Sequence, residues 1–340
     1  METRSVARNV LVAIGLAALA LFLWKILPVV MLAFAGIVLA VALHAGSEPL
    51  ARRLHVPDAI GVAIVVLLVG ALLGAIGWLF GTRLADQAQE LSDVLPGAAR
   101  GAQEFLRQSE LGRRVLAVMG SAGDGATVSR IAKGTITAFG GILDALLVIV
   151  TALYLAANPE AYVRGALRLL PPASRARVAH ALADAAAKLR RWLLGQLASM
   201  TVVGIATGIG LAIAHVPMPF ALGLLSGLLD FVPVVGPLVA AVPGVLVAFT
   251  QGPDVALWAI VVYGVVQFTE GHFIVPMVQR WAVSLPPAMG LLGAVVFGIL
   301  FGAIGVLFAM PLLVALVSLV QDLYVRPMEA ALDTGGKKRR

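Results

Sequence analysis

Residues 219–249, PFALGLLSGLLDFVPVVGPLVAAVPGVLVAF, decide the fold that this sequence predicts. The stretch is apolar enough to lie in a membrane, but Pro233, Gly236 and Pro237 interrupt it near its middle. Because proline has no backbone N–H and its ring clashes with the preceding helical turn, one continuous spanning helix is not expected here. The pattern predicts two short helices joined by an irregular tip.

These two helices are expected to form a hairpin over residues 219–250. The first should run from Leu222 to about Asp230 and the second should begin near Leu238, since the residue before a proline disfavours helical geometry. An unpaired backbone group in hydrocarbon costs several kcal/mol, so the tip must be packed in protein or line a wet cavity. Broken helices at membrane depth are where transporters hold their substrates and ions.

Asp230 places an acid at the C-terminal end of the first half-helix. The backbone dipole already puts about half a negative charge there, so an ionised carboxylate needs a cation, a proton or donors beside it. This position predicts a cation or proton site. The alternative is an Asp at a wet helix end that makes ordinary hydrogen bonds.

The composition indicates an all-α polytopic membrane protein. The 340 residues are 60% hydrophobic and only 13% charged, whereas soluble domains are nearer about 45–50% apolar and 25% charged. The net charge is +7, but the basic residues flank apolar runs as the positive-inside rule requires, so no nucleic-acid partner is expected. The chain has no cysteine and no HExxH motif, and we expect no cofactor and no metal other than sodium.

We expect about six full spans and two hairpins, about eight transmembrane segments in all. The apolar run 10–43 would reach roughly 51 Å as one helix, so we expect a tight pair of helices turning at Lys25. A cleaved signal peptide is the alternative. The predicted segments are spans 1–3 in residues 1–81, an extracytoplasmic amphipathic helical segment at 82–133, span 4 at 134–157, a basic cytoplasmic segment at 158–195, a transport core at 196–326 and a basic cytoplasmic tail at 327–340.

The distribution of basic residues predicts that both termini are cytoplasmic. With this orientation, 17 of the 25 Lys and Arg residues lie inside. The exposed amphipathic segments at 82–133 favour a homo-oligomer.

The last apolar stretch resembles the first hairpin. A second hairpin is therefore predicted over 286–325, broken at Gly302 and Gly305; chance similarity of apolar sequence is the alternative. One span separates the two hairpins, so they would enter the membrane from opposite sides as an inverted repeat, which suits alternating access. A shift of 67 residues places Pro219, Ala221, Gly223, Leu224 and Leu225 on Pro286, Ala288, Gly290, Leu291 and Leu292, and a one-residue slip then places Pro243 on Pro311.

Polar residues end the span between the two hairpins. Gln267 and Glu270 are three residues apart and so share a helix face, with Thr269 beside them. An amide, a carboxylate and a hydroxyl can coordinate a dehydrated cation or hold a small polar solute, and Glu270 can exchange that cation for a proton. The alternative is an interfacial cluster without a role. Asp144 in span 4 is a weaker candidate, which can instead pair with a basic residue or cap a helix.

Four segments together resemble the autoinducer-2 exporter family, the PerM-like permeases. The motifs are DFVPVVGPLVAAVPGVLVAF at 230–249, QFTEGHFIVPMVQRWAVSLPP at 267–287, FGAIGVLFAMPLLVAL at 301–316 and PVVMLAFAGIVLAVALHAGSEPLARRL at 28–54. Two features depart from the family pattern. Val234 replaces a common aromatic residue, and the residues after Pro276 lack the usual lysine and glycine.

The resemblance implies a bacterial inner-membrane transporter. Members of the family are described as exporters of autoinducer-2 or as sodium (lithium)/proton antiporters. The family residues carried over by motif are Asp230, Pro233, Gly236, Pro237, Gln267, Glu270 and Pro276.

We expect a secondary transporter in the lipid bilayer that moves a small polar solute or a monovalent cation coupled to protons. An uncoupled channel or facilitator and a non-transporting scaffold are the alternatives. No GxSxG, HExxH or GxGD motif is present, so enzymatic activity is not expected.

Overall fold

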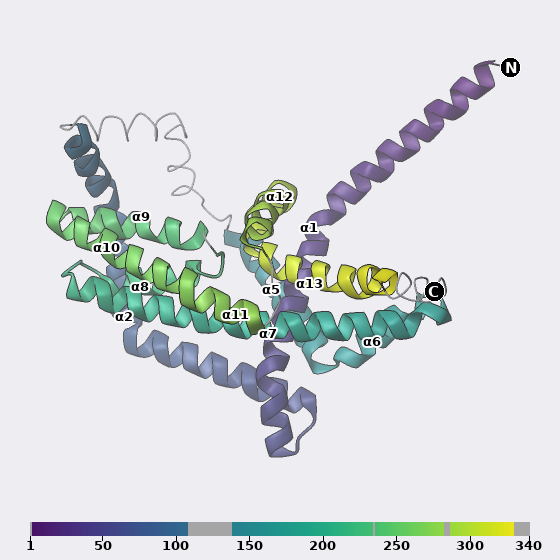
Figure 1. The fold of residues 1–340 in the computed structure, drawn as a ribbon, viewed down its shortest axis with the longest axis horizontal. Coiled ribbons are helices and arrows are strands. Elements are labelled where there is room, and N and C mark those ends of the chain that lie inside the picture. Colours follow the sequence, from purple (N-terminus) through teal and green to yellow (C-terminus); the bar gives the residue numbers. More distant parts are fainter. Residues whose placement is uncertain (1, 108–137, 234, 282–285, 330–340) are drawn as a thin grey trace, which may run out of the picture.

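The computed structural model describes residues 2–107, 138–233, 235–281 and 286–329, and every regular element in these ranges is a helix. This confirms the all-α class (Figure 1). The helices are α1 (Glu2–Leu54), α2 (Asp58–Arg107), α5 (Ala138–Ala157), α6 (Pro159–Arg168), α7 (Pro172–Ile213), α8 (Pro219–Leu229), α9 (Val235–Phe249), α10 (Pro253–Thr269), η1 (Glu270–Ile274), α11 (Val275–Trp281), α12 (Pro287–Leu307), α13 (Ala309–Val320) and η2 (Gln321–Val325).

By length and apolar composition, five of the described helices can cross a membrane. A sixth is added if α5 and α6, which meet at 90°, form one broken span. Large apolar side chains such as Ile205, Ile209 and Ile213 are exposed on α7, as expected for a lipid-facing surface. The protein is therefore a multi-pass membrane protein, and the predicted number of about eight segments is not confirmed.

The N-terminal pair of helices that we predicted is wrong. α1 is one helix of 53 residues that runs through both Lys25 and Pro28. The segment around Lys25 has no Gly, Asn or Asp to form a turn, and a turn there would leave backbone groups unpaired in hydrocarbon. A proline within an apolar helix is less costly than such a turn, because neighbouring helices can satisfy the carbonyl that it frees.

Two long helices run across predicted segment boundaries, and the boundaries themselves stay predictions. Residues 82–107 continue α2 from the third span, and the remainder of the predicted 82–133 segment lies outside the described residues. The basic segment 158–195 forms α6 and the first half of α7, which passes without interruption into the predicted transport core. Alanine, leucine, arginine and lysine dominate this segment, and all four favour helix.

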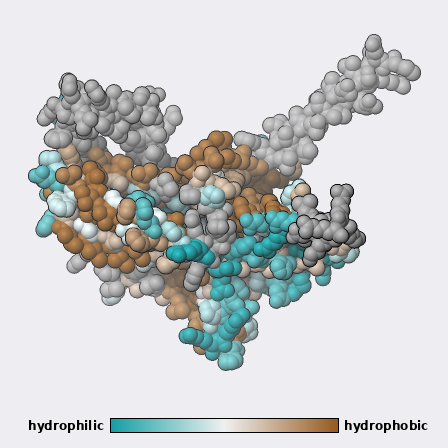
Figure 2. All heavy atoms as spheres, viewed as in Figure 1, coloured by the Kyte–Doolittle hydropathy of each residue, from teal (hydrophilic) through white to brown (hydrophobic). Residues whose placement is uncertain are grey.

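The polar end of α1 lies near the first half of α7. Arg190 on α7 forms an ion pair with Glu48 on α1 and also donates to the carbonyl of Ala45 at 3.2 Å. Figure 2 shows hydrophilic surface over this part of the molecule and hydrophobic surface over α9, α10 and α12. These two segments therefore lie near each other, and their common cytoplasmic location stays a prediction.

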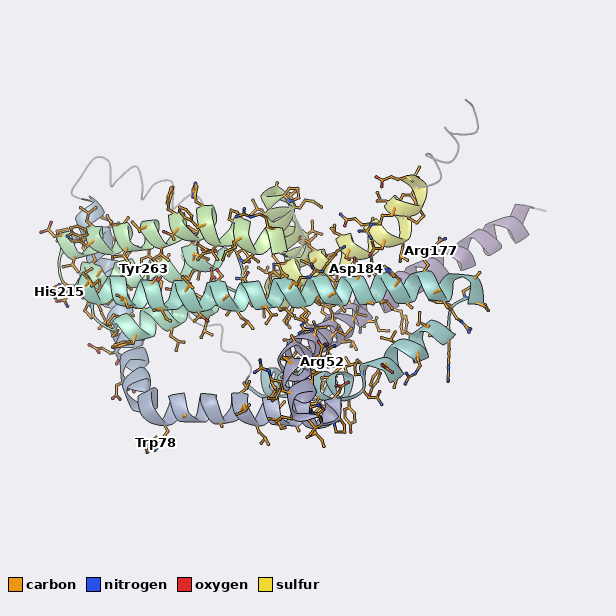
Figure 3. All side chains as sticks on the ribbon, turned by 60° about the horizontal axis from the view of Figure 1, so that its bottom comes forward. Arg52, Trp78, Arg177, Asp184, His215 and Tyr263 are labelled. Carbon is orange, nitrogen blue, oxygen red and sulfur yellow. The ribbon has the colours of Figure 1, made fainter. Side chains whose placement is uncertain are left out.

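α7 is the helix around which the core is built, and α8 packs closely along it (Figure 3). Glycines make this approach possible. A Cβ on Gly223 would lie 2.7 Å from the carbonyl oxygen of Gly204, and one on Gly227 would lie 2.7 Å from that of Met200. Small residues at helix contacts are the usual solution in membranes, where packing rather than hydrophobicity holds helices together.

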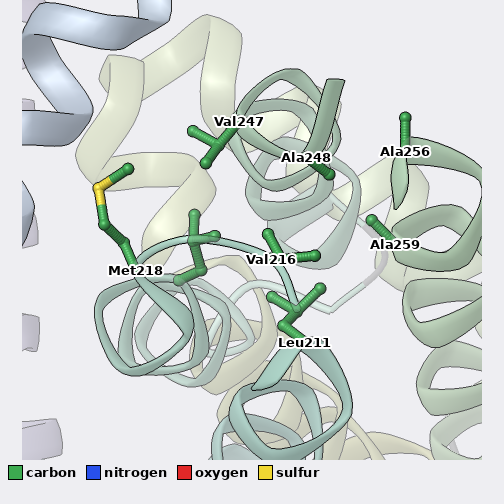
Figure 4. Packing of buried hydrophobic residues seen from close by; sticks show 8 residues of the cluster. Leu211, Val216, Met218, Val247, Ala248, Ala256 and Ala259 are labelled. Atoms are coloured by element: carbon green, nitrogen blue, oxygen red, sulfur yellow. The ribbon is translucent and has the colours of Figure 1, made fainter. Parts of the chain in front are cut away.

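The first broken segment forms as predicted, with α8 ending at Leu229 and α9 beginning at Val235. Its open end is fixed by an apolar cluster that joins the end of α7 to the starts of α8 and α10 and the end of α9 (Figure 4). Leu211 and Val247 are fully buried there. From there α8 runs back along α7, so that its last residues, at the tip, lie beside Gln196.

The second broken segment also has its break where the sequence predicted one. Gly302 leaves helical geometry with φ of 66° and ψ of −147°, which glycine adopts readily and other residues do not. The chain then folds back so closely that a Cβ on Gly305 would lie 1.9 Å from the carbonyl oxygen of Phe297. α13 follows, with Pro311 fully buried. Opposite orientation of the two segments stays a prediction.

Candidate functional site

Asp230 lies at the tip of the first broken segment and is fully buried. Its backbone caps α8, because Pro233 and the close approach of Gly236 prevent the helix from continuing. Gln196 on α7 donates from Nε2 to the Asp230 carbonyl oxygen at 2.7 Å and lies 3.5 Å from its Oδ2. This amide ties the irregular tip to the central helix.

Glu270 is the second buried acid, with only 3% of its surface exposed. It begins η1, a single π-helical turn between α10 and α11, and such turns are frequent at functional sites. Gln267 donates from Nε2 to Oε2 of Glu270 at 3.0 Å. The Glu270 carboxyl faces that of Asp230, although the two residues are 40 positions apart in the sequence.

Glu270 lines a cavity of about 250 Å³; the fully buried Asp230 contacts Glu270 and is not itself among the lining residues. The walls of the cavity come from α7, from the tip of the first broken segment, from α10 to α11 and from both helices of the second broken segment. Three of the predicted site residues line it: Pro233, Gln267 and Glu270. The other lining residues include Gly271 from η1, Trp192, Gln196 and Ser199 from α7, and Pro286, Gly290 and Met310 from the second segment. Both broken segments therefore contribute to one site.

Aromatic rings support the tip. Trp192 on α7 meets Phe231 edge to face, with ring centroids 6.0 Å apart, and Phe231 meets Phe308 of the second segment in the same manner at 6.3 Å. Edge-to-face pairs at these separations are favourable beyond the area that they bury. The chain of rings links α7 and the two broken segments next to the acids.

The site holds negative charge without a neutralising side chain among the described residues. The ion pairs among the described residues involve Glu48, Glu160, Asp184 and Asp322, and none includes Asp230 or Glu270. Oδ1 of Asp230 and Oγ of Ser199 are buried and make no hydrogen bond. A buried carboxylate that no cationic side chain neutralises is costly, so the arrangement suits a proton or a monovalent cation between the acids. Within the described ranges, no three His, Asp or Glu side chains gather as a divalent metal would require.

The structure separates the other sequence-predicted residues from this pair. Thr269 is exposed and donates to the Val265 carbonyl at 2.8 Å, so it does not line the cavity. Pro237 lines a neighbouring chamber instead. Asp144 belongs to α5, but its side chain lies outside the described residues. Gly302, Gly305 and Pro311 shape the second segment and do not touch the cavity.

Sequence reasoning missed the contribution of α7. Gln196 and Ser199 are three residues apart in an apolar helix, and Trp192 is one turn before them, so all three share a face. The three-residue spacing of Gln196 and Ser199 equals that of Gln267 and Glu270, so the same pattern could have identified them. Gln196 lies at a predicted span boundary, where a polar residue needs no special role.

Replacement of Gln196 by leucine is expected to loosen the tip. The variant keeps the side-chain bulk but leaves the Asp230 carbonyl without its donor, which costs about 1–3 kcal/mol for a buried group. We expect a lower melting temperature of the purified protein in detergent, measured by intrinsic fluorescence. Gln251→Leu, at an exposed position beyond α9, is the matched control and should melt as the native protein does. Equal melting of both variants would show that the Gln196 amide does not hold the tip.

Comparisons with known proteins agree with this picture. The family model described as "AI-2E family transporter" matches residues 11–324. "Putative transport protein YueF" of Bacillus subtilis is 27% identical over 288 residues, which cover 78% of this chain and 77% of that protein. "Putative transport protein YrrI" of the same organism is 28% identical, over 52% of its length. "Putative permease PerM" of Escherichia coli K12 is 29% identical over 149 residues, 42% of its length.

Proposed function

Since the chain belongs to the AI-2E transporter family, we propose that it is a secondary transporter of the bacterial inner membrane. The cargo is a small polar solute or a monovalent cation, and the cavity around Asp230 and Glu270 couples its movement to protons. Both termini are cytoplasmic in this proposal, and the working unit is a homo-oligomer. The contact between two buried acids at a broken helix is the observation that supports it most.

The acid pair supplies the coupling chemistry. Two carboxyls in contact cannot both remain ionised in an apolar surrounding unless a cation lies between them, so a proton and a cation compete for the same place. Binding of one displaces the other, which is the requirement for exchange. The amides of Gln196 and Gln267 hold the pair in position while the occupant changes.

Alternating access follows from the position of the cavity between two broken segments. In this proposal the segments have opposite orientations, so movement of one opens the site to the cytoplasm and movement of the other opens it to the outside. The glycine contacts between α7 and α8 make these helices one rigid unit, against which the second segment moves.

Flux in proteoliposomes tests the proposal. Purified protein is reconstituted, and sodium, lithium and autoinducer-2 are each offered under an imposed pH gradient. We expect flux of at least one of them to saturate with concentration and to collapse when a proton ionophore removes the gradient. Flux that rises linearly and ignores the gradient would indicate an uncoupled facilitator, and absence of flux for all three would favour a non-transporting scaffold.

A further inference from the structure

The short helix α6 leaves the end of α5 at 90°. α5 has 20 residues, which at about 1.5 Å per residue reach about 30 Å and cross the hydrocarbon core without help from α6. The turn between them has a local cause. Pro159 keeps Asn158 out of helical geometry, and the Asn158 side chain accepts from the N–H of Ala161 in the first turn of α6. α6 therefore begins where α5 reaches the membrane surface, and it runs along that surface.

α6 has an apolar face and a basic face. At about 100° per residue, the apolar side chains of Tyr162, Val163 and Leu169 point to one side of the helix. Arg164 and Arg168 point to the opposite side. A short helix with an aromatic and aliphatic face and arginines on the other face is typical of one that lies in the plane of a membrane interface.

The apolar face of α6 is not covered by the described part of the protein. No residue of α6 is buried, and Tyr162, Val163 and Leu169 are 47%, 38% and 88% exposed. The helix cannot instead dip through the bilayer, because its 10 residues reach only about 15 Å and would carry the arginines into hydrocarbon. The boundary between headgroups and acyl chains, at which α5 ends, is the surrounding that covers the face.

The charge of this region indicates which lipids it meets. Residues 158–183 contain four arginines and a single acid, Glu160. Glu160 pairs with Arg164 at 2.6 Å, whereas Arg168 makes no ion pair within the described ranges. A zwitterionic lipid balances its phosphate with its own ammonium group. An excess of arginine therefore favours anionic phospholipids, whose charge is not balanced.

The end of α6 is fastened to the start of α7. Arg175 donates from Nε to the Leu170 carbonyl at 3.0 Å and from Nη2 to the Arg168 carbonyl at 3.3 Å. These bonds pair carbonyls that the last turn of a helix leaves open. Since α7 also carries Gln196 into the acid cavity, the position of α6 on the membrane helps to set the position of that helix.

We propose that α6 is an interfacial helix that binds anionic phospholipids of the bilayer. Tyr162, Val163 and Leu169 enter the boundary of the acyl chains, while Arg164 and Arg168 contact lipid phosphates. The lipid is a partner of the protein in addition to any transported cargo, so the inference is independent of the proposed transport function.

Lipid quenching of a fluorescent label tests the position of the helix. The native chain has no cysteine, so Leu169→Cys supplies a single thiol for the fluorophore NBD. The labelled protein is placed in nanodiscs of equal parts phosphatidylglycerol and phosphatidylcholine, with a doxyl quencher near the top of the acyl chain. We expect strong quenching at Leu169→Cys. Ala161→Cys, an exposed position on the basic face, is the matched control and should be quenched little.

Three results would overturn the proposal. Water-like emission without quenching at Leu169→Cys would show that the face lies in solvent. Blue-shifted emission without quenching would show that protein, such as a second copy of this chain, covers it. Equal quenching of both labels would place the whole helix inside the hydrocarbon.

The choice of lipid is tested by moving the quencher. The doxyl group is carried either by phosphatidylglycerol or by phosphatidylcholine in nanodiscs of otherwise identical composition, and quenching by the first should exceed quenching by the second. A basic residue near an anionic surface contributes about 1 kcal/mol, a factor of about 5 in binding, so Arg168→Gln should lower this preference about 5-fold.

Arg177→Gln is the control for the loss of charge. Arg177 is an exposed arginine two residues after Arg175, which places it on the opposite face of α7 from α6. This variant should keep the native preference for phosphatidylglycerol. Equal quenching by the two lipids in the native protein, or a preference that Arg168→Gln leaves unchanged, contradicts recognition of anionic lipid by α6.

Discussion

Glu270→Gln is expected to remove proton-coupled flux while leaving the protein folded. Glutamine has the shape of glutamate and can still bond to Gln267, but it cannot release a proton or neutralise a cation. A charge-assisted hydrogen bond contributes about 1.5–3 kcal/mol, so binding at the pair should weaken by about 10- to 100-fold. The measurement is sodium uptake into proteoliposomes driven by a pH gradient, together with the melting temperature in detergent.

Two further variants make the result specific. Asp230→Asn should reproduce the loss, because the two carboxyls act on one occupant. Glu160→Gln should not, since Glu160 lies on α6 with 79% of its side chain exposed and bonds only to Arg164 among the described residues. Native flux in Glu270→Gln would show that the acid pair is structural and would favour the scaffold interpretation.

Gly236→Ala is expected to be the most disruptive single methyl addition at the first tip. Its Cβ would lie 1.7 Å from the Leu229 carbonyl oxygen and 2.4 Å from the carbonyl carbon. Both are backbone atoms, so no side chain can rotate away and the end of α8 must move. Overpacking of this kind costs about 1–3 kcal/mol or more, and the displaced segment carries Asp230. We expect a lower melting temperature and loss of flux together.

Gly264→Ala is the matched control. Gly264 lies within α10, and a Cβ there meets no atom within 4 Å. Alanine in a helix interior is favoured over glycine by about 0.5–1 kcal/mol, so this variant should melt at the native temperature or slightly above it. If Gly236→Ala also melts like the native protein and transports normally, the tip does not depend on close approach of its two helices.

The positions of both breaks could be predicted because their causes are local. Pro233 prevents α8 from continuing, and Gly302 supplies the backbone conformation that a sharp reversal needs. The same reasoning failed at Pro28, where proline lies inside a long helix. A proline ends an apolar helix only where a turn can satisfy the backbone groups that it leaves unpaired, and the sequence around Lys25 offers none.

The sequence identifies Asp230 and Glu270 as candidate site residues, but it does not predict that their carboxyl groups are in contact. Asp230 and Glu270 stood out because ionisable groups in apolar segments are costly and rare. Their contact, and the reach of Gln196 to the Asp230 carbonyl, depend on how α7, α8 and α10 cross. Helix crossings are set by side-chain and glycine contacts spread over many turns, which no local pattern encodes.

The sequence by itself determined that this protein lies in a lipid bilayer, that it is helical and where two of its helices break. Hydropathy and proline act within a few residues of where they occur. Only the tertiary structure decided that α1 is continuous, that α7 supplies one wall of the site, and that Asp230 and Glu270 meet. Those outcomes arise from close packing between distant segments, where the absence of a Cβ at Gly223 lets α8 approach α7.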